Sequence, residues 1–124
     1  YQVTKTVSED MTAASIGSGG LPVLATPYLI ALVENAAFSL LQQELPEDKS
    51  SVGTMVQLTH TSPSPVGMTV TVTVEITAIS ANGKMIDFKA SACDSAGPIG
   101  EGTHQRAVIS CERFMSKCQS KLEQ

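Results

Sequence analysis

Glu34 is the residue whose type and setting most strongly suggest chemistry. It is the sole charged residue between Pro22 and Gln43, a stretch that is otherwise almost entirely apolar. Burying a lone carboxylate costs several kcal/mol unless the group is paired or protonated, so its presence needs a reason. One interpretation is a carboxylate held in a pocket, where it acts as a base or a nucleophile. The other is that Glu34 and Asn35 form a thin stripe that faces solvent or a partner subunit.

His60 is the second candidate, because it lies near the end of a Thr-rich strand pattern, just before the break at Ser62–Pro65. Strand ends commonly present side chains to a cleft, although a histidine there also serves as a structural hydrogen-bonding residue, and both interpretations stay open. His104, in the middle of a later strand, is the weaker candidate. Two histidines and three cysteines without ligand spacing predict no metal site, and the phosphate-binding and nucleophile-elbow motifs are missing.

Thr26 stands at the predicted start of a helix over residues 27–43. A hydroxyl at the cap position, followed by Pro27 at the first helical position, is typical of a helix start. The same hydroxyl and the amides of the first turn could stabilise an oxyanion. In a regular helix, Thr26 and Glu34 stand ~12 Å apart along the axis. A shared site therefore requires the preceding chain to fold back, or one group to come from a second subunit.

The residue pattern of the remaining chain is typical of strands joined by tight turns. Residues 1–7 are predicted to form a short first strand, and residues 12–20 a flexible loop or lid. The helix has so few polar residues that we expect it to be covered nearly all round. Further strands are predicted over residues 52–61, 68–79, 85–93 and 99–114, with Asn82-Gly83 as a type I′ turn and a fraying tail over 116–124. This order predicts an α+β fold, in which a five-stranded antiparallel sheet surrounds one helix as a single domain over residues 1–124. The exposed sheet edge predicts a homodimer.

Composition excludes several classes of protein. The chain has 124 residues, of which 42% are hydrophobic and 16% charged, which is too apolar for a disordered chain. Its net charge of −4 argues against binding to nucleic acid or to an anionic membrane. Its long uncharged stretches are broken by Gly, Pro, Ser and Thr, so no membrane span is predicted. Three cysteines without paired spacing fit a reducing, cytoplasmic setting.

Together, these residues resemble the fluoroacetyl-CoA thioesterase family of hot-dog-fold proteins. The resemblance covers roughly residues 23–114. The matching segments are Val23-Leu24-Ala25-Thr26-Pro27 followed by Glu34, Val52-Gly53-Thr54 leading to His60, then Pro65–Val70 and Gly100–His104. It implies a hot-dog fold, in which a long helix is wrapped by an antiparallel sheet, and a homodimer with its active sites at the subunit interface.

The resemblance also implies roles for individual residues. Thr26, Glu34 and His60 correspond to the family's catalytic set, and the backbone of Gly53 corresponds to the group that helps to position the thioester carbonyl. No cofactor is implied beyond coenzyme A as part of the substrate. The anionic nucleotide end of coenzyme A would need cationic contacts, for which Arg106 is a candidate substrate-binding residue and Lys84 a second one.

The expected activity is hydrolysis of a small acyl-CoA to the free acid and CoA. Glu34 would attack the carbonyl or activate water, His60 would move protons, and Thr26 would orient the carboxylate or the substrate. The family's fluoroacetyl-selective enzyme carries phenylalanines in a lid before the helix, whereas Ser15–Leu21 has no aromatic residue, so fluoroacetyl selectivity is not expected. The alternative is a non-catalytic protein that binds an acyl-CoA or another small apolar ligand. A hot-dog dehydratase is disfavoured, since no suitable Asp and His pair is evident.

Overall fold

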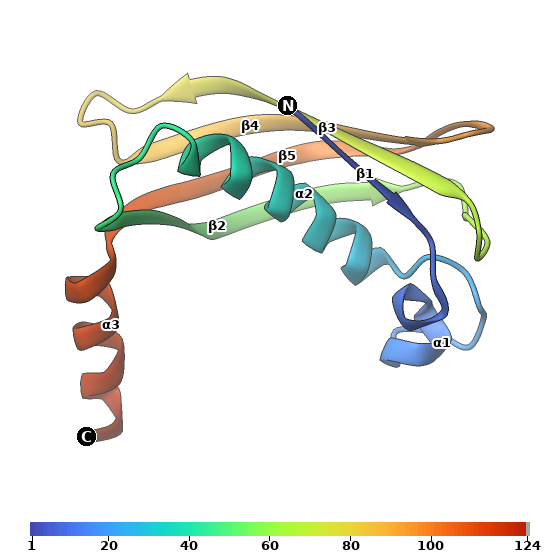
Figure 1. Cartoon of the computed structure of the whole chain (residues 1–124), viewed down its shortest axis with the longest axis horizontal. Helices are drawn as coiled ribbons and strands as arrows, with labels where there is room; N and C mark the ends of the chain where they lie inside the picture. The colour runs from blue at the N-terminus through green and yellow to red at the C-terminus, as the bar shows by residue number, and fades with distance from the viewer. Residues whose placement is uncertain (124) are drawn as a thin grey trace.

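A computed structural model describes residues 1–123 and contains one curved antiparallel sheet with a long helix lying across one of its faces (Figure 1). The five strands follow the spatial order β1-β3-β4-β5-β2. Their bounds are β1 Gln2–Thr6, β2 Lys49–His60, β3 Thr69–Ile79, β4 Met85–Asp94 and β5 Gly97–Ser110. The long helix is α2, Thr26–Gln42. The predicted α+β architecture of a sheet around one helix is therefore confirmed.

The face of the sheet that meets α2 is built by alternating side chains. In β3, Val70, Val72 and Val74 are buried, while the intervening threonines lie on the opposite face. This period of two is what a half-buried strand requires. Leu29, Val33 and the other buried residues of α2 belong to the same core as these valines.

One side of α2 is left uncovered in the single chain. Pro27, Ala31, Asn35 and Phe38 are all exposed, at a spacing that places them along one side of the helix. We call these four residues the α2 stripe. The expectation that the helix is covered nearly all round is therefore wrong for the single chain, because the sheet covers only the opposite side.

The segment before α2 is more ordered than the predicted loop. It contains a 3-10 turn, Glu9–Met11, and a one-turn helix, α1, Ala13–Ile16. The side chain of Thr12 accepts a hydrogen bond from the backbone N–H of Ser15, and Gly17 ends the turn with a left-handed φ of 80°. An N-cap and a C-terminal glycine stabilise a single turn even where the sequence lacks helical periodicity.

The turn between β3 and β4 is not of type I′. That type needs positive φ at both central residues, whereas Gly83 has φ 72° and no residue other than glycine has positive φ in the described chain. Instead, the N–H of Gly83 donates to the carbonyl of Ser80, and the Asn82 side chain accepts from the N–H of Lys84. The prediction of a turn at Asn82-Gly83 is confirmed, but the side chain of Asn82 stabilises a turn that is longer than a type I′ turn.

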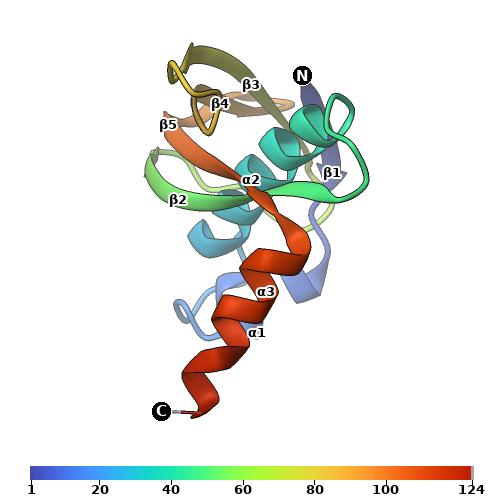
Figure 2. The ribbon, with the colours of Figure 1, turned by 90° about the vertical axis from the view of Figure 1, so that its left-hand side faces the viewer.

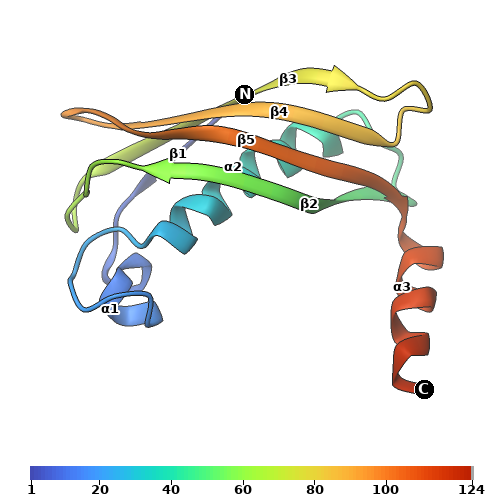
Figure 3. The ribbon, with the colours of Figure 1, turned by 180° about the vertical axis from the view of Figure 1, so that it is seen from behind.

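The last predicted strand ends early. β5 stops at Ser110 rather than Phe114 and is followed by α3, Cys111–Gln119, and by a 3-10 turn, Ser120–Glu123. Ser110 pairs with Lys49, the first residue of β2, so no strand continues beside the chain beyond this point. The residues that follow Ser110 form the helix α3 instead. Figure 3 shows α3 and α1 at opposite ends of the sheet, and Figure 2, which views the chain from the α3 end, shows α3 extending away from the sheet.

Among residues 1–123, no helix combines the length and the apolar character needed to cross a membrane.

Candidate active site

The start of α2 and the end of β2 bring Thr26 and His60 into contact. The hydroxyl oxygen of Thr26 lies 2.8 Å from Nδ1 of His60, a hydrogen-bonding distance. Thr26 was expected to cap the helix, but Ala25 occupies the cap position and Thr26 is already helical. Its hydroxyl is therefore available to His60. A cavity of about 270 Å³ adjoins the pair and is lined by Ala13, Ser18, Val23, Leu24, Thr26 and His60–Pro63.

The other ring nitrogen of His60 lacks a partner. Nε2 is buried and forms no hydrogen bond within the described structure. An unsatisfied buried nitrogen is costly, and such groups often mark a site that meets a water or a ligand. Burial also lowers the pKa of His60 below 6.5, because desolvation disfavours the imidazolium. His60 is therefore neutral at pH 7, with one nitrogen able to accept a proton.

Glu34 lies two turns further along α2 and faces Gly53 of β2. A Cβ at Gly53 would stand only 2.6 Å from Oε2 of Glu34, so the carboxylate fills the space that a side chain would need. In the single chain, 42% of the Glu34 side chain is exposed. Glu34 thus lies beside the α2 stripe while its carboxylate turns toward the sheet.

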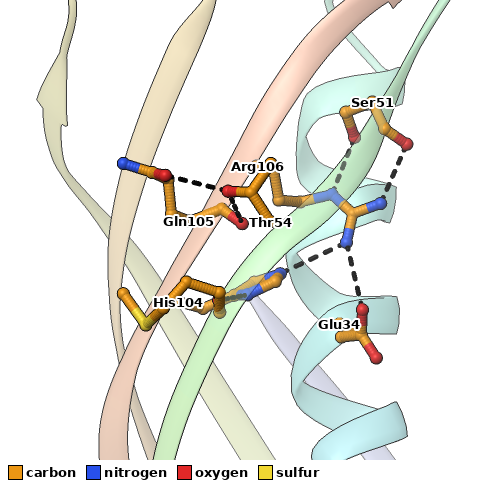
Figure 4. Close-up of polar contacts among 7 residues, drawn as sticks. Glu34, Ser51, Thr54, His104, Gln105 and Arg106 are labelled. Carbon is orange, nitrogen blue, oxygen red and sulfur yellow. Dashed lines mark hydrogen bonds and ion pairs between the residues drawn. The ribbon is translucent and has the colours of Figure 1, made fainter.

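Arg106 is the cation that faces this carboxylate (Figure 4). Its Nη1 lies 3.9 Å from Oε2 of Glu34, while its Nε and Nη2 donate to the hydroxyl and the carbonyl of Ser51. The guanidinium carbon also lies 5.9 Å from the ring centre of Phe38. Arg106 is only 5% exposed, and this burial lowers the pKa of its guanidinium below the usual value, while the charge of Glu34 acts in the opposite direction. The structure therefore directs Arg106 toward Glu34 rather than toward the surface.

His104 is a hydrogen-bond partner of Arg106. Nδ1 of His104 lies 2.7 Å from the carbonyl oxygen of Met55, and Nε2 lies 3.2 Å from Nη1 of Arg106. A guanidinium can only donate, so Nε2 must accept and Nδ1–H must donate to Met55, which makes His104 neutral. Desolvation, which lowers the pKa of this fully buried residue, favours the same state. The imidazole also stacks on the ring of Phe88.

A β-bulge shapes the strand at Glu34. The register of β2 against β5 shifts between Gly53 and Met55, which leaves Thr54 without an opposite residue. The Thr54 hydroxyl is 2.9 Å from Oε1 of Gln105 and 3.1 Å from the Gln105 carbonyl oxygen, so it bonds back to the neighbouring strand. Bulges bend a strand and redirect its side chains, and they are frequent beside active sites.

The predicted site residues therefore form two clusters in the single chain. Thr26 with His60 is one, and Glu34 with Gly53 and Arg106 is the other. Within residues 1–123, no hydrogen bond or ion pair connects the two clusters. No group of three or more His, Cys, Asp or Glu side chains in this part of the chain is placed to hold a metal ion.

Sequence reasoning did not identify Ser51 and His104 as partners of Arg106. A signal was available, because His104 and Arg106 are two residues apart on one strand and so share a face. Two polar residues on the face that packs against an apolar helix indicate a buried polar network.

Comparison with known proteins shows the family to which the chain is related. Residues 7–112 match the model of the family described as fluoroacetyl-CoA-specific thioesterase. A fluoroacetyl-CoA thioesterase from Streptantibioticus cattleyicolor is 38% identical over 99 residues, which cover 80% of this chain and 70% of that protein.

Solved structures show the same fold. The crystal structure of the fluoroacetyl-CoA thioesterase FlK superposes with a TM-score of 0.91 at 31% identity, over 98% of this chain and 93% of that one. A hot-dog-like protein from Thermanaerovibrio acidaminovorans superposes with a TM-score of 0.88 at 24% identity, over 98% and 88% of the two chains. The predicted hot-dog fold is confirmed, and the chain belongs to the fluoroacetyl-CoA-specific thioesterase family.

Proposed function

We propose that this chain hydrolyses a small acyl-CoA thioester to the free acid and CoA. The observation that carries the proposal is His60, whose Nδ1 is held by Thr26 while its buried Nε2 has no partner beside a cavity. A neutral imidazole oriented in this way is suited to moving protons during acyl transfer. Membership of a thioesterase family supports a thioester as the group that is cleaved.

Glu34 supplies the carboxylate in this mechanism. It attacks the thioester carbonyl or orients the attacking water, while neutral His60 accepts the proton that this water loses and passes it to the thiolate released when the C–S bond breaks. The backbone N–H of Gly53 is the donor for the developing oxyanion. Arg106 keeps Glu34 oriented, because the buried guanidinium lies 3.9 Å from Oε2.

A homodimer unites the two clusters. β2 is an edge strand of the sheet, and Gly53 and His60 both face α2, since each lies against a side chain of that helix. If β2 pairs antiparallel with its copy about a two-fold axis near the middle of the strand, the end that carries His60 in one subunit lies beside the segment around Gly53 in the other. Each active site then contains Thr26 and His60 of one subunit and Glu34 of its partner.

The shape of the cavity favours a small acyl group without fluorine selectivity. Its lining contains Ala13, Ser18 and Val23 but no aromatic side chain, so the aromatic lid of the fluoroacetyl-selective enzyme has no counterpart there. We further propose that residues 1–124 act as one domain, in the cytoplasm, where acyl-CoA esters and reduced cysteines are both found.

A thiol-release assay over acetyl-, propionyl-, butyryl-, hexanoyl- and fluoroacetyl-CoA tests the proposal. Glu34→Gln keeps the size of the side chain and removes its basicity, so we expect turnover to fall by two or more orders of magnitude. Glu44→Gln, a matched change at an exposed position just after α2, should keep full activity.

Circular dichroism should show the same fold for both variants. Undiminished hydrolysis by Glu34→Gln would remove Glu34 from the mechanism. A chain that is stabilised against heat by acyl-CoA but releases no thiol from any ester would be a binding protein instead.

A further inference from the structure

A second concave surface lies at the end of the sheet opposite α1. The turn between β3 and β4, the first residue of β2 and helix α3 enclose a cleft of about 1100 Å³. Figures 1 and 3 both show these three segments meeting at one end of the sheet. We call this the α3 cleft. It contains none of the residues of the two active-site clusters.

The charges of the α3 cleft are unlike those of the rest of the chain. The chain has eight Lys and Arg residues and a net charge of −4, yet four of the eight line this one surface. They are Lys49, Lys84, Arg113 and Lys117, and Glu112 is the only acidic residue that lines the cleft with them. None of the four forms an ion pair in the part of the chain that the structure describes. Like charges gathered in a cleft create a local positive potential, which attracts an anion of several charges.

The cleft also offers an apolar surface. Val108, Ile109 and the exposed ring of Phe114 line it beside the cations. An aromatic ring next to basic side chains suits a nucleotide, because the base can stack on the ring while the phosphates contact the cations. An inorganic anion would use the cations alone.

The position of the cleft relates it to the thioester site. Lys49 and Gly53 lie on the same strand, four residues apart, which corresponds to ~13 Å of extended chain. A nucleotide in the cleft and a thioester at Glu34 are thus separated by a distance that an extended pantetheine arm can bridge. The cleft therefore lies where the far end of a CoA ester would emerge.

We infer that the α3 cleft binds the phosphorylated nucleotide of the CoA substrate, through Lys49, Lys84, Arg113 and Lys117 with Phe114 against the base. This inference rests on the proposed function and adds to it. Lys84 was expected from the sequence to contact the nucleotide of CoA, and the cleft adds three further cations and an aromatic ring to that contact. It also places the recognition of the nucleotide on α3, a helix that follows the sheet.

Charge reversal in the cleft tests the inference. Lys84→Glu and Arg113→Glu each replace a phosphate contact by a repulsive charge, so KM for the preferred acyl-CoA should rise about tenfold or more with kcat unchanged. The same acyl group carried on pantetheine, which has no nucleotide, should be hydrolysed equally by the wild type and both variants. Lys5→Glu, the same charge change on exposed β1, is the matched control and should leave both substrates unaffected. Lys84→Gln removes the charge without reversing it and should give a smaller rise in KM. This graded effect distinguishes a lost phosphate contact from a change in folding.

Calorimetry separates this inference from the proposed function. CoA and 3′-phosphoadenosine 5′-diphosphate should bind to the wild type and bind about tenfold more weakly to Lys84→Glu and Arg113→Glu, whether or not any thioester is hydrolysed. Equal affinity of wild type and variants for CoA would overturn the inference, even if hydrolysis is confirmed. Pyrophosphate that binds as tightly as the nucleotide would also overturn it, since the cleft would then be a site for free anions.

Discussion

At the position of Gly53, the absence of a side chain makes room for the carboxylate of Glu34. A Cβ would lie 2.6 Å from Oε2 of Glu34 and 3.3 Å from Cε1 of His104. Since His104 is held by Met55, Phe88 and Arg106, the carboxylate is the group that must move. Gly53 is thus required for the orientation of Glu34, in addition to any contact of its N–H with substrate.

Gly53→Ala should therefore impair catalysis more than folding. We expect kcat to fall roughly ten- to hundredfold, because a displacement of about 1 Å at a reacting group has effects of that size. Steady-state kinetics and a thermal melt measure the two effects. Thr103→Ala, at an exposed residue of the neighbouring strand β5, is the control and should retain activity. An active Gly53→Ala enzyme would show that the observed position of Glu34 is not the catalytic one.

The pKa of His60 predicts the pH dependence of the reaction. Its pKa lies below 6.5 because burial disfavours the charged form. The neutral, proton-accepting state therefore persists as the pH falls from 8 to 6.5 and is lost only below that. We expect kcat/KM to stay level over that range and to decline at lower pH.

A pH profile and an NMR titration of the two histidines measure this. His60→Gln removes one of the two ring signals and so assigns the other to His104. A decline in activity centred above pH 6.5 would contradict the neutral role of His60.

At the scale of elements, the segment with α1 decides the shape of the cavity beside His60. Ala13 and Ser18 line that cavity, whereas Ile16, on the same short segment, does not. Thr12, which is nearly fully buried, anchors the turn through its hydrogen bonds to Glu9 and Ser15. The cavity wall is therefore an ordered turn with small side chains.

Ser18→Phe should narrow the cavity and change acyl-chain selectivity. We expect kcat/KM for hexanoyl-CoA to fall by at least tenfold relative to acetyl-CoA, because the longer chain needs the volume that the ring takes. Ile16→Phe places the same ring outside the cavity and should leave the ratio unchanged. Comparison of kcat/KM across the acyl-CoA panel measures this ratio. An unchanged ratio in Ser18→Phe would mean that the acyl group lies elsewhere.

At the scale of the whole molecule, the α2 stripe and the free edge of β2 are the surfaces that the proposed homodimer would cover. Phe38 is 37% exposed and Met55 of β2 is 43% exposed, so the α2 stripe and the free edge each present a large apolar side chain. A partner that covers these surfaces would also complete the site. Activity should therefore depend on assembly.

Ala31→Glu places a charge in the middle of the α2 stripe without disturbing the helix. We expect light scattering to show a dimer for the wild type and a monomer for Ala31→Glu, with loss of thioester hydrolysis and an unchanged circular dichroism spectrum. Ile79→Glu, an exposed apolar position at the end of β3, should remain an active dimer. A wild-type chain that is monomeric and fully active would contradict the shared site.

The five strands and the long helix were predictable from the sequence, because the signals that specify them are local. The alternation of valine and threonine predicted β3, and the apolar run after Thr26-Pro27 predicted α2, with bounds that differ by a residue or so. The errors fell where two local signals compete. The helix-forming residues after Ser110 follow directly on a strand pattern, and Asn82 suits more than one kind of turn.

The contacts of the site were decided by tertiary structure alone. Thr26 meets His60 across 34 residues of sequence, and the pairing of Glu34 with Arg106 depends on the register of β2 against β5, which the bulge at Thr54 shifts. A shift by one residue would turn each side chain to the other face of the sheet. Residue types and periodicity therefore determined which groups are available and which face they share. Only the folded register decided which of them touch, since that depends on long-range pairing which no local pattern encodes.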